Sequence, residues 1–121
     1  MKASELRIGN LVLLDTGFCP PFPHKIMAED LAKWDKIPTG AKVEPIEITQ
    51  EWLKKFGLGQ SNDHEMQKDI REDLAIQFDY HFKRCYLFVD TDLDCTCIFL
   101  EHIKYVHQLQ NLYFALTGEE L

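Results

Sequence analysis

Three aspartates at alternate positions form the first pattern that could bind a cation: Asp90, Asp92 and Asp94. With Glu101 at the twelfth position, they match the oxygen-ligand spacing of a calcium-binding helix-loop-helix. However, Cys95 stands where that loop needs glycine, and the flanking segments are typical of strands. An extended segment after Asp94 would place Glu101 about 20 Å away. We therefore expect a solvent-exposed hairpin turn, with the three aspartates as the candidate metal ligands.

Soft metal ligands gather in the same half of the chain: His81, Cys85, Cys95, Cys97 and His102. Zinc sites usually contain Cys-x-x-Cys pairs, whereas Cys95 and Cys97 are separated by one residue and would share one face of a strand. We expect small buried thiols in a sheet rather than a zinc site. The sequence contains no phosphate-binding loop and no nucleophile motif, so we predict no catalytic residue and no cofactor.

Length and composition indicate one globular domain over residues 1–121, with 45% apolar and 27% charged residues. No apolar run approaches the roughly 20 residues that span a bilayer, and the first nine residues lack a secretory signal. We expect a cytoplasmic protein that does not enter a membrane. Four cysteines are few for this length, so we expect free thiols in a reducing compartment.

The net charge of −7 comes entirely from the second half, because residues 1–60 carry eight basic and eight acidic side chains. Residues 61–121 carry five basic and twelve acidic side chains. An acidic surface repels phosphate backbones, so nucleic-acid binding is disfavoured.

Several short elements are predicted in the first half. Leu6–Leu14 favours a buried strand, and the prolines of Cys19–Pro23 indicate a stiff loop that cannot be helix or central strand. Ala28–Lys36 is typical of a short helix, and Lys42–Ile48 of an edge strand around Pro45. Thr49 is a candidate N-cap for a helix that ends at Gly57.

The second half is predicted to be mainly sheet. Ser61–Leu74 favours a solvated helix, because Met66, Ile70 and Leu74 are spaced by four, and its acidic residues would be ordinary surface charges. An antiparallel meander then follows in residues 75–82, 85–89 and 95–103. Tyr105–Leu116 has helical apolar spacing and precedes Gly118.

Together these elements predict an α+β fold, in which an antiparallel meander packs against the C-terminal helix and a short central helix. The opening strand and the proline loop could form a small barrel-like N-terminal part.

Four polar residues of the C-terminal helix are a candidate interaction surface: His107, Gln108, Gln110 and Asn111. The alternative is that these side chains solvate the helix and tie it to neighbouring backbone.

Three segments, ELRIGNLV at residues 5–12, PIEITQEWLKKFGL at 45–58 and YVHQLQNLYFALTGEEL at 105–121, resemble small uncharacterised proteins of gut anaerobic bacteria, their prophages and mobile elements. The resemblance implies a shared domain and a mobile-element origin. It implies no activity and no functional residue.

We therefore predict a non-catalytic accessory or protein-interaction module with an unknown protein partner, and a homo-oligomer is possible. The alternative is a divalent-metal-dependent enzyme that uses the segment 90–97. A third hypothesis, nucleic-acid binding by the N-terminal part, is disfavoured by charge.

Overall fold

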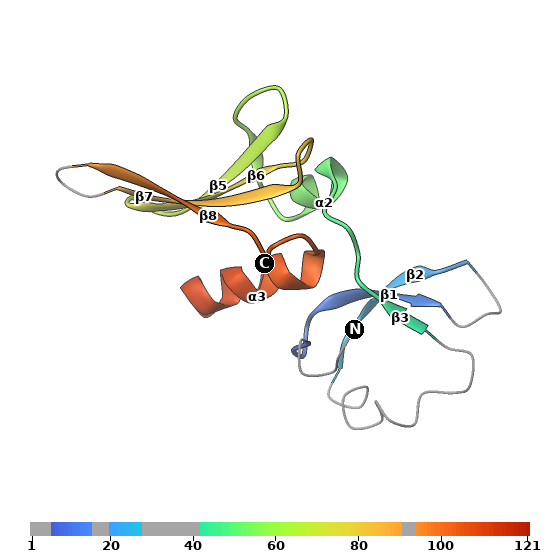
Figure 1. Ribbon diagram of the computed structural model, residues 1–121. Helices are drawn as coiled ribbons and strands as arrows, with labels where there is room; N and C mark the ends of the chain where they lie inside the picture. The colour runs from blue at the N-terminus through green and yellow to red at the C-terminus, as the bar shows by residue number, and fades with distance from the viewer. Residues whose placement is uncertain (1–5, 16–19, 28–41, 91–93) are drawn as a thin grey trace. The chain divides into compact units, whose positions relative to one another are not determined.

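The computed structural model describes residues 6–15, 20–27, 42–90 and 94–121 (Figure 1). The chain divides into two compact units. Unit 1 contains Met1–Glu47 and Tyr105–Leu121, and unit 2 contains Ile48–Lys104. Each unit has an antiparallel sheet, and helices accompany both sheets, so the predicted α+β class is confirmed.

Unit 1 has a three-stranded sheet, in which β1 (Leu11–Asp15) pairs antiparallel with β2 (Phe22–Lys25) and β3 (Lys42–Glu44). The order β2-β1-β3 makes β1 the central strand, and no pair closes the described strands into a barrel. The helix α3 (Val106–Thr117) packs against β1. A small apolar core of Leu6, Val12 and Ile26 forms around β1.

The two edge strands of this sheet show how proline directs the local fold. Part of the predicted proline loop is wrong, because Phe22 and Pro23 belong to β2. Proline has no N–H to donate, and an edge strand tolerates this because its outer side has no neighbour to bond. The predicted edge strand Lys42–Ile48 is confirmed over Lys42–Glu44, which forms β3, whereas Pro45 and the residues after it lie beyond the strand. The predicted helix Ala28–Lys36 lies outside the described residues.

Unit 2 is a five-stranded antiparallel meander in the order β4-β5-β6-β7-β8. Its strands are β4 (Gly59–Gln60), β5 (Glu65–Arg71), β6 (Leu74–Asp79), β7 (Arg84–Asp90) and β8 (Cys95–Leu100). The last three strands confirm the meander that the sequence predicts.

The predicted solvated helix Ser61–Leu74 is wrong, because most of this segment forms β5. A spacing of four residues fits the helical period but equally fits the period of two of a strand. Met66 lies opposite Phe78 and is fully buried, whereas Ile70 lies at a register irregularity between Asp69 and Arg71. The Asn62 side chain accepts a hydrogen bond from His64 N (3.2 Å) within the turn before β5.

The two short-range helix signals that were predicted from the sequence are confirmed. Helix α2 (Gln50–Lys55) begins after Thr49, whose hydroxyl accepts a bond from Trp52 N, and the following Gly57 has a φ of +85°. Helix α3 ends at Gly118 in the left-handed conformation, with a φ of +75°. These helix boundaries could be predicted from nearby residues, because a helix cap depends on residues within one turn.

Strand register gives the large sheet two different faces. Met66, Phe78 and Cys85 lie opposite one another on an apolar face and are buried. The next residue along each strand points to the second face, which is mixed in character. This mixed face contains charged, polar, aromatic and thiol side chains together with Ala75: Glu65, Gln67, Asp69, Gln77, Asp79, Arg84, Tyr86, Phe88, Asp90, Cys95, Cys97 and Phe99.

The left-handed conformation of Gly118 gives a direct test of the end of α3. A Cβ at Gly118 or at Gly59 would meet no atom within 4 Å, but only Gly118 has a positive φ. We expect Gly118→Ala to lower the free energy of unfolding by about 1 kcal/mol through backbone strain alone. Gly59→Ala is the matched control and should cost nothing or stabilise slightly. Equal effects in urea denaturation would contradict the assigned helix end.

Candidate interaction surface

Strand β8 is the open edge of the large sheet. It pairs with β7 on one side, and no described strand pairs with its other side. In an antiparallel sheet, the backbone N–H and C=O groups on that outer side are available to another strand. β8 is six residues long, whereas β4 at the opposite edge has two.

The side chains of β8 offer no protection against strand addition. Its sequence, CTCIFL, has no charged residue and no proline, and the first five of its residues are exposed. Ile98 and Phe99 are 43% and 51% exposed. Pairing with β7 runs without a bulge from Cys85↔Leu100 to Asp90↔Cys95. Natural edge strands are usually protected by lysine, proline or a bulge, so this edge has the features of a docking site.

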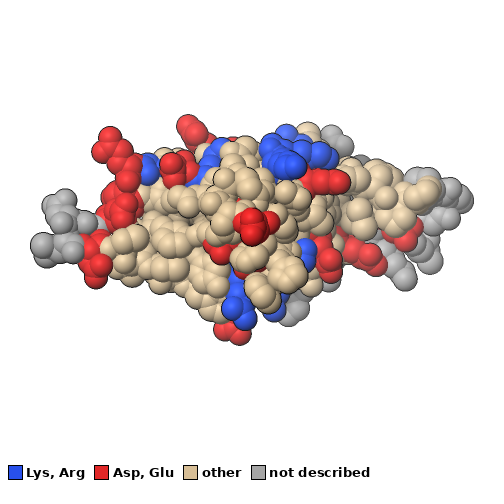
Figure 2. All heavy atoms as spheres, turned by 90° about the horizontal axis from the view of Figure 1, so that it is seen from above, with Lys and Arg blue, Asp and Glu red and all other residues tan. Residues whose placement is uncertain are grey.

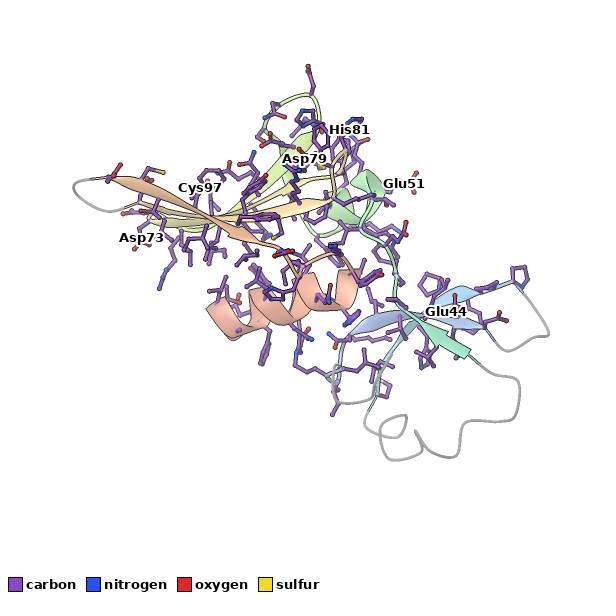
Figure 3. All side chains as sticks on the ribbon, viewed as in Figure 1. Glu44, Glu51, Asp73, Asp79, His81 and Cys97 are labelled. Carbon is purple, nitrogen blue, oxygen red and sulfur yellow. The ribbon has the colours of Figure 1, made fainter. Side chains whose placement is uncertain are left out.

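Aromatic residues continue the apolar character of β8 onto the mixed face. Phe99 lies opposite Tyr86 on β7, with ring centroids 5.5 Å apart. Phe88 lies opposite Cys97, whose side chain also projects from this face (Figure 3). A partner side chain placed beside β8 on this face would therefore contact aromatic surface.

An acidic hollow of about 330 Å³ lies at the end of the sheet where β8 begins. Four carboxylates line it, with Arg71 as the basic residue and Cys95 at its border: Asp69, Glu72, Asp73 and Asp90. The Arg71 guanidinium pairs with Asp73 at 3.5 Å, so three carboxylates exceed the local positive charge. Figure 2 shows acidic side chains gathered at this end of the sheet, beside the grey loop at the left. A basic side chain is the ligand that this charge favours.

Of the predicted metal ligands, Asp90 lines this hollow, and Asp94 directly precedes Cys95 at its border. Asp90 and Asp94 are exposed, Asp94 Oδ1 accepts a hydrogen bond from Cys95 N (2.8 Å), and Asp92 lies outside the described residues. Glu101 follows the far end of extended β8, so the calcium-loop arrangement does not form. Weak cation binding by the aspartates alone stays a prediction.

The thiols that the sequence brings near one another are separated by the sheet. Cys95 and Cys97 lie on the mixed face and are exposed, whereas Cys85 lies on the apolar face. Burial raises the pKa of the Cys85 thiol to about 12. The pKa of Cys95 is raised mainly by a hydrogen bond with Asp90, and neighbouring carboxylates add to this. These cysteines do not form one metal centre, and the expectation of buried thiols is confirmed for Cys85 but is wrong for Cys95 and Cys97.

The four candidate residues of α3 are used largely within unit 1. Gln110 is buried, and its Oε1 accepts a bond from Leu11 N (2.8 Å) while its Nε2 donates to Gly9 O. Asn111 Oδ1 accepts a bond from the Asn10 amide (2.8 Å). His107 is buried, and half-buried Gln108 accepts a bond from Tyr105 N (3.0 Å). The contacts of Gln110 and Asn111 agree with the alternative to an interaction surface, because these amides bind the helix to the residues around Asn10 of the same chain.

No protein-family model, no curated protein and no solved structure matches this chain. The function must therefore be argued from the geometry of its own residues.

None of the helices in the described part of the chain combines the length and hydropathy needed to cross a membrane.

The open edge was not predicted from the sequence, although one signal was present. The run of six uncharged residues between Asp94 and Glu101 is unusual in a strand that lies at an edge. An uncharged run indicates an open edge only if its strand lies at the edge of the sheet, and the strand order shows that β8 does.

The hydrogen bond between Asp90 and Cys95 predicts the pH dependence of thiol reactivity. Because its pKa is raised, Cys95 stays protonated to higher pH and carries less reactive thiolate at neutral pH. We expect Asp90→Asn to lower the pKa of Cys95 and to speed its alkylation by iodoacetamide several-fold at neutral pH. Peptide mass spectrometry measures each cysteine separately. Cys85 should react only after unfolding, and an unchanged Cys95 rate would contradict the assignment.

Proposed function

We propose that this protein is a non-catalytic interaction module that binds an extended segment of a partner protein along β8. The observation that carries the proposal is the long, exposed and uncharged edge of the large sheet. In such strand addition, main-chain hydrogen bonds provide affinity, and alternate side chains of the added strand provide specificity.

The acidic hollow supports a partner segment that carries a basic residue. A strand added beside β8 would run past Cys95, which borders the hollow. A lysine or arginine of the partner at that end could extend its long side chain toward Asp90. The net charge of −7 would also steer a basic segment toward the protein.

The same charges disfavour a second copy of this chain as the occupant. Antiparallel pairing of two β8 strands along their whole length would set Asp94 of one copy opposite Glu101 of the other. This like-charge contact would occur at both ends of the pair, and directly opposed like charges destabilise a sheet. An accessory role in a mobile genetic element stays a proposal that rests on the sequence resemblance.

Selection from a displayed library of random ten-residue peptides tests this proposal without a known partner. We expect peptides selected on the wild-type chain to alternate apolar residues and to carry lysine or arginine toward one end. Phe99→Lys should reduce their affinity at least tenfold, because it places a charge on the docking edge and repels the basic segment. Affinity is measured by titration with the synthetic peptide, at low and at physiological salt.

Phe82→Lys is the matched control, because Phe82 is also exposed but lies in the turn between β6 and β7. This variant should retain affinity. Equal loss in both variants, or selection of acidic peptides, would contradict the proposal. A dimer in sedimentation that Phe99→Lys dissociates would show that a second copy occupies the edge instead.

A further inference from the structure

A second cluster of polar residues lies at the opposite end of the same sheet from the acidic hollow. It contains His64 and Glu65, where β5 begins, and Asp79, where β6 ends. Glu65 and Asp79 are direct cross-strand partners, so their carboxylates share the mixed face. A backbone hydrogen bond from Tyr80 N to His64 O (3.1 Å) holds the two turns together.

Three potential metal-binding atoms converge in this cluster. His64 Nδ1 lies 3.4 Å from Asp79 Oδ2 and 3.8 Å from Glu65 Oε1. One ligand atom from each of the three residues lies within 4.8 Å of the others. For zinc bonded at about 2.1 Å, neighbouring tetrahedral ligand atoms are about 3.4 Å apart. The two separations from His64 Nδ1 are close to this value, and the two carboxylate oxygens lie within 4.8 Å of each other.

The orientation of Asp79 is fixed by its own backbone turn. Its Oδ1 accepts bonds from His81 N (2.9 Å) and Phe82 N (3.0 Å). The side chain is only 7% exposed, and its second oxygen faces His64. Asp79 is therefore positioned without the help of a ligand, as a preorganised metal-binding residue requires.

Backbone hydrogen bonds satisfy Asp79 Oδ1, but the cluster atoms that face one another are less well matched. Nδ1 of His64 is shielded from solvent but makes no hydrogen bond with any described residue. No lysine or arginine of the described residues forms an ion pair with Glu65 or Asp79. Two carboxylates directly opposite each other repel, and a shielded imidazole nitrogen without a hydrogen bond is costly. A cation bound between them would remove both penalties.

We propose that His64, Glu65 and Asp79 bind a zinc ion. A site with one imidazole and two carboxylates suits zinc, whereas calcium requires six to eight oxygen ligands. The ring of His81 stacks on that of His64 with centroids 5.9 Å apart, and Figure 3 shows His81 beside Asp79. The His81 imidazole neighbours the cluster, but the converging ligand atoms belong to His64, Glu65 and Asp79. The ion would link the turn before β5 to the turn after β6, independently of partner binding at β8.

The test uses a chain with Cys95→Ser and Cys97→Ser, so that these exposed thiols cannot bind the metal. Zinc affinity is measured by competition with a chromophoric chelator on protein without a histidine tag. We expect one zinc ion per chain and a thermal midpoint raised by several degrees when zinc is added. Glu65→Gln and Asp79→Asn should each weaken zinc affinity at least tenfold.

The variants are chosen to preserve the fold. Glu65→Gln is isosteric, and Asn at position 79 can still accept the two backbone bonds of the turn. His102→Ala and Glu72→Gln are matched controls and should bind zinc as tightly as the parent. A cobalt ion in the site should give the visible absorption of tetrahedral coordination, which Glu65→Gln abolishes. No one-to-one binding by the parent, or equal weakening in the controls, would overturn the proposal.

Discussion

Hydrogen bonding of β6 to β5 on one side and β7 on the other is the constraint on which unit 2 depends. All six residues of β6 are buried, so the strand can satisfy its backbone only through these two neighbours. Their register assigns the paired side chains of β5, β6 and β7 to one of two faces. A slip of one residue would move Phe78 from the core to the mixed face and bring Gln77 into the core. The positions of both proposed binding regions follow from this register.

The two ends of the mixed face have different chemistry because different turns meet there. At one end, the turn between β5 and β6 and the start of β8 bring together unmatched carboxylates around Asp90. At the other end, the turns before β5 and after β6 place an imidazole between two carboxylates. The open edge of β8 extends from the acidic end of the sheet, so an apolar strand with a basic residue complements it in both shape and charge.

The features that depend on residues close in sequence were predicted correctly. Thr49, Gly57 and Gly118 were predicted as helix boundaries, because capping and the left-handed conformation are local properties. The prediction for Ser61–Leu74 was wrong, because a spacing of four residues fits both a helix and a strand. The candidate sites were more difficult to predict from the sequence than the helices and strands. Neither the contact of His64 with Asp79 nor the edge position of β8 can be predicted without the register and order of the strands.

The most direct measurement of the central claim is residue-resolved amide hydrogen exchange along β8 in the free chain. The backbone of an open edge strand is bonded on one side only, so alternate amides should differ. We predict slow exchange for the amides that bond to β7 and exchange near the rate of an unstructured peptide for those between them. Uniform slow exchange along β8 in dilute, monomeric protein would mean that the edge is already covered, and would contradict the account.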